Sequence, residues 1–288
     1  MGAARARVFR EQSNGHGWEM AFRSPPDGVR PYVRQYCGYS ETTPGLLRRY
    51  EFPLPQVVVI FEFGPPIRLI DPADPSRVDR FPGGFTAGMT DATAITEHDG
   101  FQCGMEVKFT AIGARLFFDF PMTELANRIV SLRDVLGPAE RDISARLGEA
   151  GDWDARFDLL DRFIASRVAR ARARTDLAGW ALGRIEDSGG QVDIRGLARE
   201  LGYSQKHLIT LFRDHVGLPP KLVARLFRFD RVVQHMRSGA PGSWAEIAAA
   251  YGYYDQAHLN REVRLFTGTT PRGARELMTE VNAPPGAA

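Results

Sequence analysis

The sequence of 288 residues contains little cysteine and no long apolar segment. Its two cysteines, Cys37 and Cys103, lie far apart and lack metal-ligand or redox spacing, so we expect two free, buried thiols in a reducing compartment. The longest apolar run, residues 57–61, is much too short to cross a bilayer. The N-terminus also lacks the apolar core of a signal peptide. These absences predict a cytoplasmic protein that does not enter a membrane.

Catalytic signatures are also missing. The N-terminal half has two histidines, His16 and His98, whereas an open metal site in a barrel needs three or four protein ligands at close spacing. Glu97, His98 and Asp99 are expected to form an exposed turn before Gly100. There is no Gly-rich phosphate loop and no nucleophile turn of the type Gly-x-Ser-x-Gly. We therefore expect no catalytic residue, no metal site and no cofactor.

The net charge is only +2, but the charge is unevenly distributed along the chain. Residues 162–174 contain five arginines and no acidic residue. Residues 192–280 contain 13 Lys or Arg against 9 Asp or Glu. A basic C-terminal half favours contact with nucleic acid, although solvated helix faces would give the same counts.

The first 120 residues, approximately, have the composition of strands. Residues 56–63 are rich in β-branched and aromatic side chains, and residues 64–66, Gly-Pro-Pro, interrupt them. Residues 67–70, 85–88 and 105–110 are further short strands, spaced as in a small barrel or sandwich. A two-layer α+β domain is the alternative. Four aromatic residues are expected to fill the core of this domain rather than line a pocket: Phe61, Phe63, Phe85 and Phe101.

Helical periodicity begins near residue 121. Leu125, Ile129 and Leu132 fall on one helical face, which predicts a single helix that ends at residues 137–138, Gly-Pro. A second helix is expected over residues 153–170, with an apolar stripe that serves either as core or as a dimer seam. The stripe comprises Phe157, Leu160, Phe163, Ile164 and Val168. The arginine-rich residues 168–175 are the expected linker, and the C-terminal tail is expected to be disordered.

The C-terminal half contains an internal duplication. Eight residues of the first copy recur in the second: Ala198, Gly202, Tyr203, His207, Leu208, Arg213, Gly217 and Pro220 are matched by Ala248, Gly252, Tyr253, His258, Leu259, Arg264, Gly268 and Pro271. The offset is 50 residues up to the Gly-Tyr pair and 51 after it, so the second copy has one extra residue. A duplicated unit indicates a surface that contacts a repeating partner, and DNA, with its helical turn, is the obvious candidate.

The first copy has the pattern of two helices separated by a glycine turn. Residues 194–201 form an amphipathic helix, and Gly202 ends it because glycine enters the left-handed region at little cost. Ser204 is placed to cap the next helix. Ala198, like Ala248 in the second copy, is small because the two helices cross tightly there. This is the signature of a helix-turn-helix unit, whose second helix enters the major groove of DNA.

The second copy repeats the scheme, with a helix over residues 244–251, a turn at Gly252 and a helix cap at Asp255. Between the copies, Pro220 begins a connecting helix that runs to about Met236. Its length of about 25 Å is of the right order to hold two reading helices about 34 Å apart, which is one turn of B-DNA.

Residues 176–280 resemble the paired helix-turn-helix domain of AraC/XylS-family transcriptional regulators. The resemblance rests on Gly202-Tyr-Ser-x-x-His-Leu and Gly217-x-x-Pro-Lys in the first unit, and on Gly252-Tyr-Tyr-Asp-Gln-Ala-His-Leu and Gly268-x-Thr-Pro in the second. The N-terminal half is similar to the sensor portion of one subgroup of these regulators. That similarity rests on Gly113-Ala-Arg115, Pro121-Met-x-Glu-Leu-Ala-Asn127 and Val135-Leu-Gly137.

The resemblance implies which side chains contact DNA. The implied base readers are Lys206, Ile209 and Thr210 in the first unit and Gln256, Ala257, His258, Asn260 and Arg261 in the second. Lys and Arg favour guanine, whereas Asn and Gln favour adenine. The implied phosphate contacts, which position the protein without reading sequence, are Ser204, Arg213 and Arg264. His207 and His258 lie next to core leucines. Each is expected either to have a structural or phosphate-facing role or to read bases.

Three residues depart from the family pattern. Thr210 occupies a position that usually holds arginine, which should weaken or redirect readout by the first unit. Val263 replaces a common phenylalanine, and Leu265 replaces a common basic residue. We therefore expect the second unit to be less tightly packed and to adhere less strongly to DNA. We therefore expect unequal contacts on a non-palindromic site, with residues 256–261 carrying more of the sequence choice.

Together these features predict an α+β protein in four segments. Residues 1–167 form a β-rich, barrel-like sensor and dimerisation domain with a helical extension, residues 168–175 a basic linker, residues 176–280 an all-α domain of two helix-turn-helix units joined by a linker helix, and residues 281–288 a tail. The expected function is sequence-specific regulation of transcription initiation in response to an unidentified small-molecule effector. The expected partners are double-stranded promoter DNA, RNA polymerase and a second copy of the chain. The alternatives are an enzyme with chemistry in the N-terminal barrel, and a ligand-independent architectural DNA binder.

Overall fold

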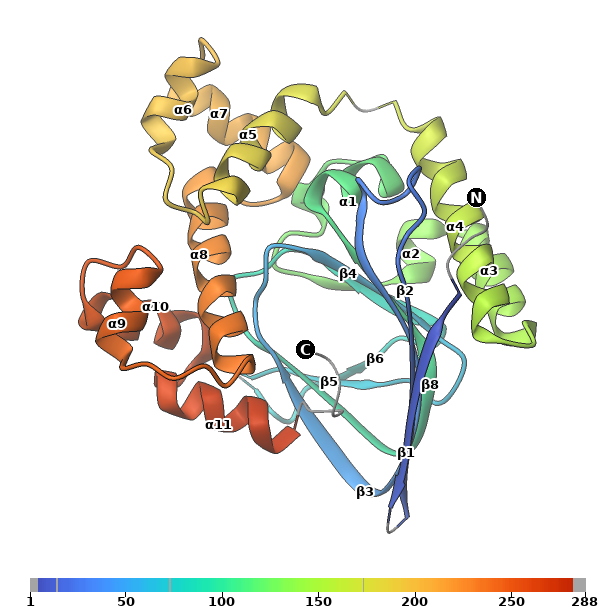
Figure 1. Ribbon diagram of the computed structural model, residues 1–288. Helices are drawn as coiled ribbons and strands as arrows, with labels where there is room; N and C mark the ends of the chain where they lie inside the picture. Colours follow the sequence, from blue (N-terminus) through green and yellow to red (C-terminus); the bar gives the residue numbers. More distant parts are fainter. Residues whose placement is uncertain (1–4, 14, 73, 173, 282–288) are drawn as a thin grey trace.

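The computed structural model describes residues 5–13, 15–72, 74–172 and 174–281. A nine-stranded antiparallel sheet with helices forms the N-terminal half, and helices alone form the C-terminal half. In Figure 1 the sheet is curved, and the C-terminal helices lie along its left side. The predicted α+β class, with a β-rich half followed by an all-α half, is confirmed. The predicted disordered tail lies outside the described residues, except for Val281 at the end of the last helix.

The sheet is strongly curved but open. Its strands follow the order β1 (Arg7–Ser13), β2 (His16–Arg23), β3 (Val33–Glu51), β8 (Ala94–Phe109), β4 (Val57–Glu62), β7 (Gly84–Ala87) and β9 (Ile129–Ser131), while β5 (Arg68–Ile70) pairs with β8 and with β6 (Val78–Arg80). The register of β3 against β8 shifts between Thr43 and Leu47, and a bulge of this kind bends both strands. Within the described residues the two outermost strands, β1 and β9, do not pair with each other, so the sheet does not close.

Strand β4 is buried on both faces. Val57, Val59 and Phe61 belong to the main core of this half, whereas Ile60 packs on the opposite face with Phe85. Burial on both faces explains why the strand is an uninterrupted apolar run instead of an alternating one. The strands predicted at residues 56–63, 67–70, 85–88 and 105–110 are confirmed as β4, β5, β7 and part of β8. Of the four phenylalanines expected in the core, Phe61 and Phe85 are buried, Phe63 is half-buried and Phe101 is exposed.

Helices cover one face of the sheet. They are α1 (Ala111–Phe118), α2 (Leu132–Leu136), α3 (Pro138–Glu149) and α4 (Trp153–Arg170), of which α3 and α4 lie at the right of Figure 1. The apolar stripe of α4 is core, since Phe157, Leu160 and Ile164 are at most 1% exposed. The buried guanidinium of Arg23 on β2 donates to Asp158 of α4 at 2.7 Å, which ties helix to sheet.

The single helix predicted after residue 121 is wrong. Instead, a short 3₁₀ turn, η1 (Met122–Glu124), is followed by strand β9 and then by α2. Asn127 has a φ of +56°, which interrupts any helix there. Ile129 then pairs with Ala87 of β7, so the backbone groups of this segment are satisfied by the free edge of the sheet instead of by a helix.

The exposed turn predicted at Glu97, His98 and Asp99 is also wrong. These residues lie inside β8, and Glu97 and His98 are 7% and 6% exposed. Glu97 accepts a hydrogen bond from Arg48 on β3 at 2.7 Å, and the His98 ring lies 3.2 Å from the Glu41 carboxylate. Partners on the neighbouring strand therefore allow the polar residues to be buried. Among the described residues, no group of three His, Cys, Asp or Glu side chains is placed to hold a metal ion.

The two cysteines are free thiols. Cys37 is buried and Cys103 is half-buried, so the predicted burial holds fully for the first only. Burial raises the pKa of the Cys37 thiol, which disfavours its reactive thiolate. None of the described helices is long and apolar enough to cross a membrane.

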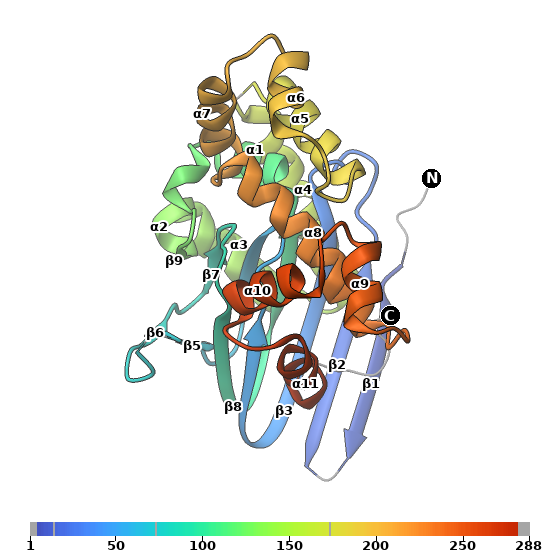
Figure 2. The ribbon, with the colours of Figure 1, turned by 90° about the vertical axis from the view of Figure 1, so that its left-hand side faces the viewer.

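In the C-terminal half, the described residues form seven helices. They are α5 (Asp176–Asp187), α6 (Ile194–Glu200), α7 (Gln205–Val216), α8 (Pro220–Arg237), α9 (Trp244–Ala250), α10 (Gln256–Thr267) and α11 (Pro271–Val281). In Figure 2, α6 and α7 lie above α9 and α10, and α8 runs between the two pairs. Helix α4 continues to Arg170 and α5 begins at Asp176, so the first residues of the predicted linker, 168–170, are helical.

A few residues of the N-terminal half belong to the apolar core of the C-terminal helices. Phe52 from the end of β3 is buried together with residues of the C-terminal helices, and its ring lies 6.4 Å from that of Phe229 on α8. Polar contacts flank this core: Arg34 on β3 pairs with Glu186 of α5 at 2.7 Å, and the Thr93 hydroxyl donates to the Phe266 carbonyl of α10 at 2.8 Å. The N-terminal half therefore contacts both α5 and α10.

Glu62 makes the stability of the N-terminal half depend on pH. Burial raises the pKa of its carboxyl to about 7, although one oxygen accepts a hydrogen bond from the Ile67 N–H. Folding thus favours the protonated carboxyl group. The stability that this group contributes is fully present below the pKa of an unfolded glutamate and is lost as pH rises through about 7. Glu62→Gln should remove this loss and raise the free energy of unfolding at pH 8 by about 3 kcal/mol.

Urea unfolding at a series of pH values measures the effect, with the exposed Glu149→Gln as the matched control. Parallel pH profiles for Glu62→Gln and the wild type would contradict the assignment.

Candidate nucleic-acid interface

The first pair of helices, α6 and α7, has the turn and caps expected of a helix-turn-helix unit. The Asp193 carboxylate caps α6. Gly202, with a φ of +69°, forms the left-handed turn. The Ser204 hydroxyl then caps α7 by accepting from the His207 N–H at 3.2 Å. Leu208, fully buried, fixes α7 against the core of the unit.

The second pair, α9 and α10, repeats this geometry. Ser243 and Glu246 form a reciprocal capping box at the start of α9. Gly252 has a φ of +76°, and the Asp255 carboxylate caps α10 by accepting from the His258 N–H at 2.6 Å. Both predicted units, with their caps and turns, are therefore present.

The two turn glycines should respond differently to a methyl group. Gly202→Ala imposes left-handed strain alone, since no atom lies within 4 Å of the added Cβ, and should cost about 1 kcal/mol of unfolding free energy. Gly252→Ala places the same Cβ 2.5 Å from Cδ of Gln191, so we expect a cost of about 2 kcal/mol. Denaturant midpoints of the two variants measure the difference. Equal costs would mean that Gln191 does not restrict this turn.

Both second helices expose the face that carries the predicted contacts. The exposed members are Ser204, Lys206, Thr210 and Arg213 around α7 and Gln256, Ala257, Arg261 and Arg264 on α10. The half-buried members are Ile209, His258 and Asn260. Ala198 on α6 and Ala248 on α9, which were predicted to be structural, are at most 1% exposed, and Leu208 and Leu259 bury the inward faces of α7 and α10. Each helix thus offers a row of side chains to a partner while its other face packs inward.

Several of these side chains also interact within the chain. The Thr210 hydroxyl donates to the Lys206 carbonyl at 3.1 Å. His258 accepts from the Tyr254 N–H through Nδ1 at 3.3 Å, and its ring packs edge-on against Tyr253 at 5.3 Å. The His207 ring packs against Tyr203 in a tilted arrangement, with the ring centroids 4.2 Å apart. Both histidines therefore contact the turn that precedes their helix.

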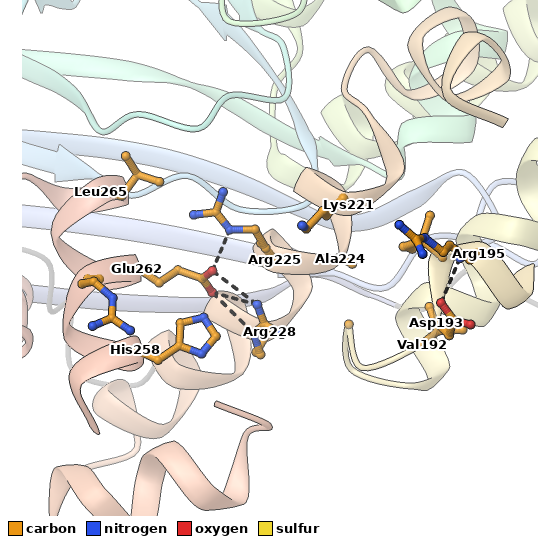
Figure 3. Close-up of a pocket in the computed structure, with 13 residues that line it drawn as sticks. Val192, Asp193, Arg195, Lys221, Ala224, Arg225, Arg228, His258, Glu262 and Leu265 are labelled. Carbon is orange, nitrogen blue, oxygen red and sulfur yellow. Dashed lines mark hydrogen bonds and ion pairs between the residues drawn. The ribbon is translucent and has the colours of Figure 1, made fainter. Parts of the chain in front are cut away.

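A groove of about 790 Å³ lies between α10 and the first unit. It is lined by the segment that leads into α6, one face of α8, and the face of α10 that carries His258, Arg261 and Leu265. Figure 3 shows the α10 side chains on one side and Asp193 and Arg195 on the other. Five cations line it: Arg195, Lys221, Arg225, Arg228 and Arg261.

Two of these arginines surround a buried acid. Glu262 of α10 is 3% exposed, and it accepts from Arg225 at 2.7 Å and from Arg228 at 3.3 Å (Figure 3). Both arginines belong to α8, so this ion pair locks α10 onto the connecting helix. A buried carboxylate is tolerated because two guanidinium groups satisfy it.

Residues 197–276 match a protein family described as a helix-turn-helix domain. This segment is an AraC-type helix-turn-helix domain. The match covers both units and the connecting helix. The match supports DNA binding and a role in transcription regulation for this domain.

Several solved structures resemble this chain at low sequence identity. ToxT from Vibrio cholerae, solved with a bound unsaturated fatty acid, is 10% identical, with a TM-score of 0.48, and the match covers 84% of this chain and 99% of that one. The AraC-like transcriptional activator CuxR is 15% identical, with a TM-score of 0.32 over 82% of this chain and 87% of the other. Bacillus subtilis oxalate decarboxylase matches 48% of this chain and 34% of its own, at 11% identity and a TM-score of 0.24. No curated protein matches the chain significantly.

Five residues of the AraC-type domain were not among the predicted contacts. They are Arg195, Lys221, Arg225, Arg228 and Glu262. Arg225 and Arg228 lie on one face of α8, and that spacing was visible in the sequence, but nothing there showed that the face turns toward α10. Glu262 lies among the polar residues of α10 that were predicted to contact DNA, and its burial depends on the packing of α10 against α8.

Proposed function

We propose that the AraC-type domain binds a non-palindromic promoter site by inserting α7 and α10 into two successive major-groove segments on one face of the duplex. The observation that carries the proposal is the repeated geometry: two capped helices with exposed polar faces, joined by the 18-residue helix α8. A helix of that length spans about 27 Å, which is compatible with reading helices about 34 Å apart.

In this proposal the two units contribute unequally. The base readers are Lys206, Ile209 and Thr210 on α7 and Gln256, Ala257, His258, Asn260 and Arg261 on α10, and the phosphate contacts are Ser204, Arg213 and Arg264. The short Thr210 side chain already donates to its own helix, so it has less to offer a base. Arg261 and Gln256 are exposed and long enough to make bidentate contacts with guanine and adenine. The second unit therefore carries more of the sequence choice.

The same proposal gives residues 1–167 the role of a sensor that binds a small-molecule effector, joined through residues 168–175 to the DNA-binding half. The apolar contact between Phe52 and Phe229 supports coupling between the two halves, because a change in the sheet would move a residue that packs directly against α8. The contact between Thr93 and Phe266 gives a second connection, to the C-terminal end of α10. Dimerisation through the N-terminal half and contact with RNA polymerase complete the proposed regulator.

Selection of bound sequences from random duplexes by the full chain tests the proposal. The expected product is a non-palindromic motif of two base blocks whose centres are separated by about 10 base pairs, with the stronger preference in one block. Failure to enrich any motif, while the chain remains folded, would contradict sequence-specific binding. Repeating the selection with residues 176–288 alone reports whether the N-terminal half sets the arrangement of sites.

A further inference from the structure

We propose that the groove between the two units is a binding site for the sugar-phosphate backbone of DNA, with Lys221 and Arg195 as its phosphate partners. The inference rests on the proposed function, since it places the duplex across both reading helices. It adds contacts from α8 and from the start of α6, whereas the contacts described above come from the reading helices and the Ser204 cap.

The position of the groove favours this occupant. One wall is α10, which carries the proposed base reader Arg261, and the opposite wall is the start of α6 in the first unit (Figure 3). The floor is α8, the helix that connects the units. A duplex that touches both reading helices must pass a strand of its backbone between the two major-groove segments. That strand crosses the groove.

The charges that remain free in the groove are positive. Arg225 and Arg228 are engaged by Glu262, and Asp193 is engaged in capping α6 and pairing with Arg199 at 3.8 Å.

By contrast, Lys221, Arg195 and Arg261 are exposed, and none of them forms an ion pair with another residue of the described part of the chain. The groove thus keeps three uncompensated cations on its open side.

The apolar surface of the groove suits a nucleic-acid backbone. Leu265 is 59% exposed on the α10 wall, and Val192 and Ile194 lie half-buried at the opposite wall. An exposed leucine next to cations can contact the deoxyribose between two phosphates. A backbone presents anionic and apolar groups in alternation, which matches this lining better than a fully polar anion does.

Phosphate contacts carry no sequence information, which makes the proposal testable. The variants Lys221→Ala and Arg195→Ala, and the double variant, are compared with Arg146→Ala on α3, which removes an equal charge on the other side of the molecule. Binding of the full chain is measured over a range of salt concentrations, with the selected duplex and with a scrambled one. Thermal unfolding of each variant checks that the fold is kept.

Each groove variant should bind both duplexes about 3- to 10-fold more weakly. The plot of the logarithm of the association constant against the logarithm of the salt concentration should become less steep, by about 1 for each substitution and about 2 for the double variant. Arg146→Ala should leave the slope unchanged. Unchanged slopes in the groove variants, or losses confined to the selected duplex, would overturn the proposal.

A small anion is the competing occupant. Inorganic phosphate that binds the DNA-free chain tightly, and that loses this binding in Lys221→Ala, would identify the groove as a small-anion site and would also overturn the proposal. These outcomes are distinct from failure of the proposed function, in which the wild-type chain selects no sequence at all.

Discussion

Replacing Glu262 with alanine is expected to lower the free energy of unfolding by about 3 kcal/mol. The carboxylate is almost completely buried between Arg225 and Arg228, so its removal leaves two guanidinium groups without their shared acceptor. Arg228 is itself 15% exposed in its side chain and cannot be hydrated fully without moving. Since the ion pair joins α10 to α8, the variant should also lose sequence-specific DNA affinity.

The exposed ion pair between Arg272 and Glu276 on α11 is the matched control. Both partners are more than half exposed, so Glu276→Ala should cost only a few tenths of a kcal/mol. Equilibrium unfolding in urea measures both variants under the same conditions. Glu262→Gln should fall between them, because the amide oxygen still accepts one hydrogen bond. A cost for Glu262→Ala no larger than that for Glu276→Ala would show that the buried pair does not hold α10 in place.

Reversing the charge at Arg261 should weaken binding to the selected duplex by about 100-fold, which corresponds to about 2.7 kcal/mol, the upper part of the range for one bidentate base contact. Arg261 is exposed and forms no ion pair with the described residues, so Arg261→Glu should leave unfolding unchanged. Fluorescence anisotropy at fixed salt measures the affinity. The loss should be much smaller on a scrambled duplex, because only the phosphate attraction is affected there.

Arg146→Glu on α3 makes the same change in net charge far from the reading helices. It should weaken binding to both duplexes equally and only slightly. Equal losses for Arg261→Glu and Arg146→Glu would mean that α10 contributes general charge and no base reading.

The C-terminal half could be predicted well from the sequence because its signals are local. Gly202 and Gly252 mark the turns, Ser204 and Asp255 mark the caps, and each acts within a few residues of its own position. Repetition of the same pattern 50 residues later removed the remaining ambiguity. The ends of α8 at Pro220 and Arg237 agree with the expected helix to within one residue.

The N-terminal half was predicted less well because its strands are determined by distant partners. Ile129 has helical spacing with Leu125 and Leu132, but the free edge of β7 draws it into a strand. Glu97 and His98 look like turn residues, and only pairing across β3 and β8 supplies the arginine and carboxylate that bury them. Strand β3 itself was missed, because Gly38, Pro44 and Gly45 interrupt its alternation.

The candidate site shows the same division. The expected DNA contacts follow from the family resemblance, and most of these side chains are exposed, whereas Ile209, His258 and Asn260 are half-buried. The ion pair of Glu262 and the groove beside it arise from the packing of α10 against α8, which no single helix encodes.

The central claim is that two unequal helices read one site on one face of the duplex, and methylation interference by the full chain on its selected duplex tests it most directly. We predict two clusters of interfering purines, separated by about 10 base pairs on the same face, with the stronger interference where Gln256 and Arg261 contact the DNA. A single cluster, or two equal clusters in a palindrome, would contradict the account.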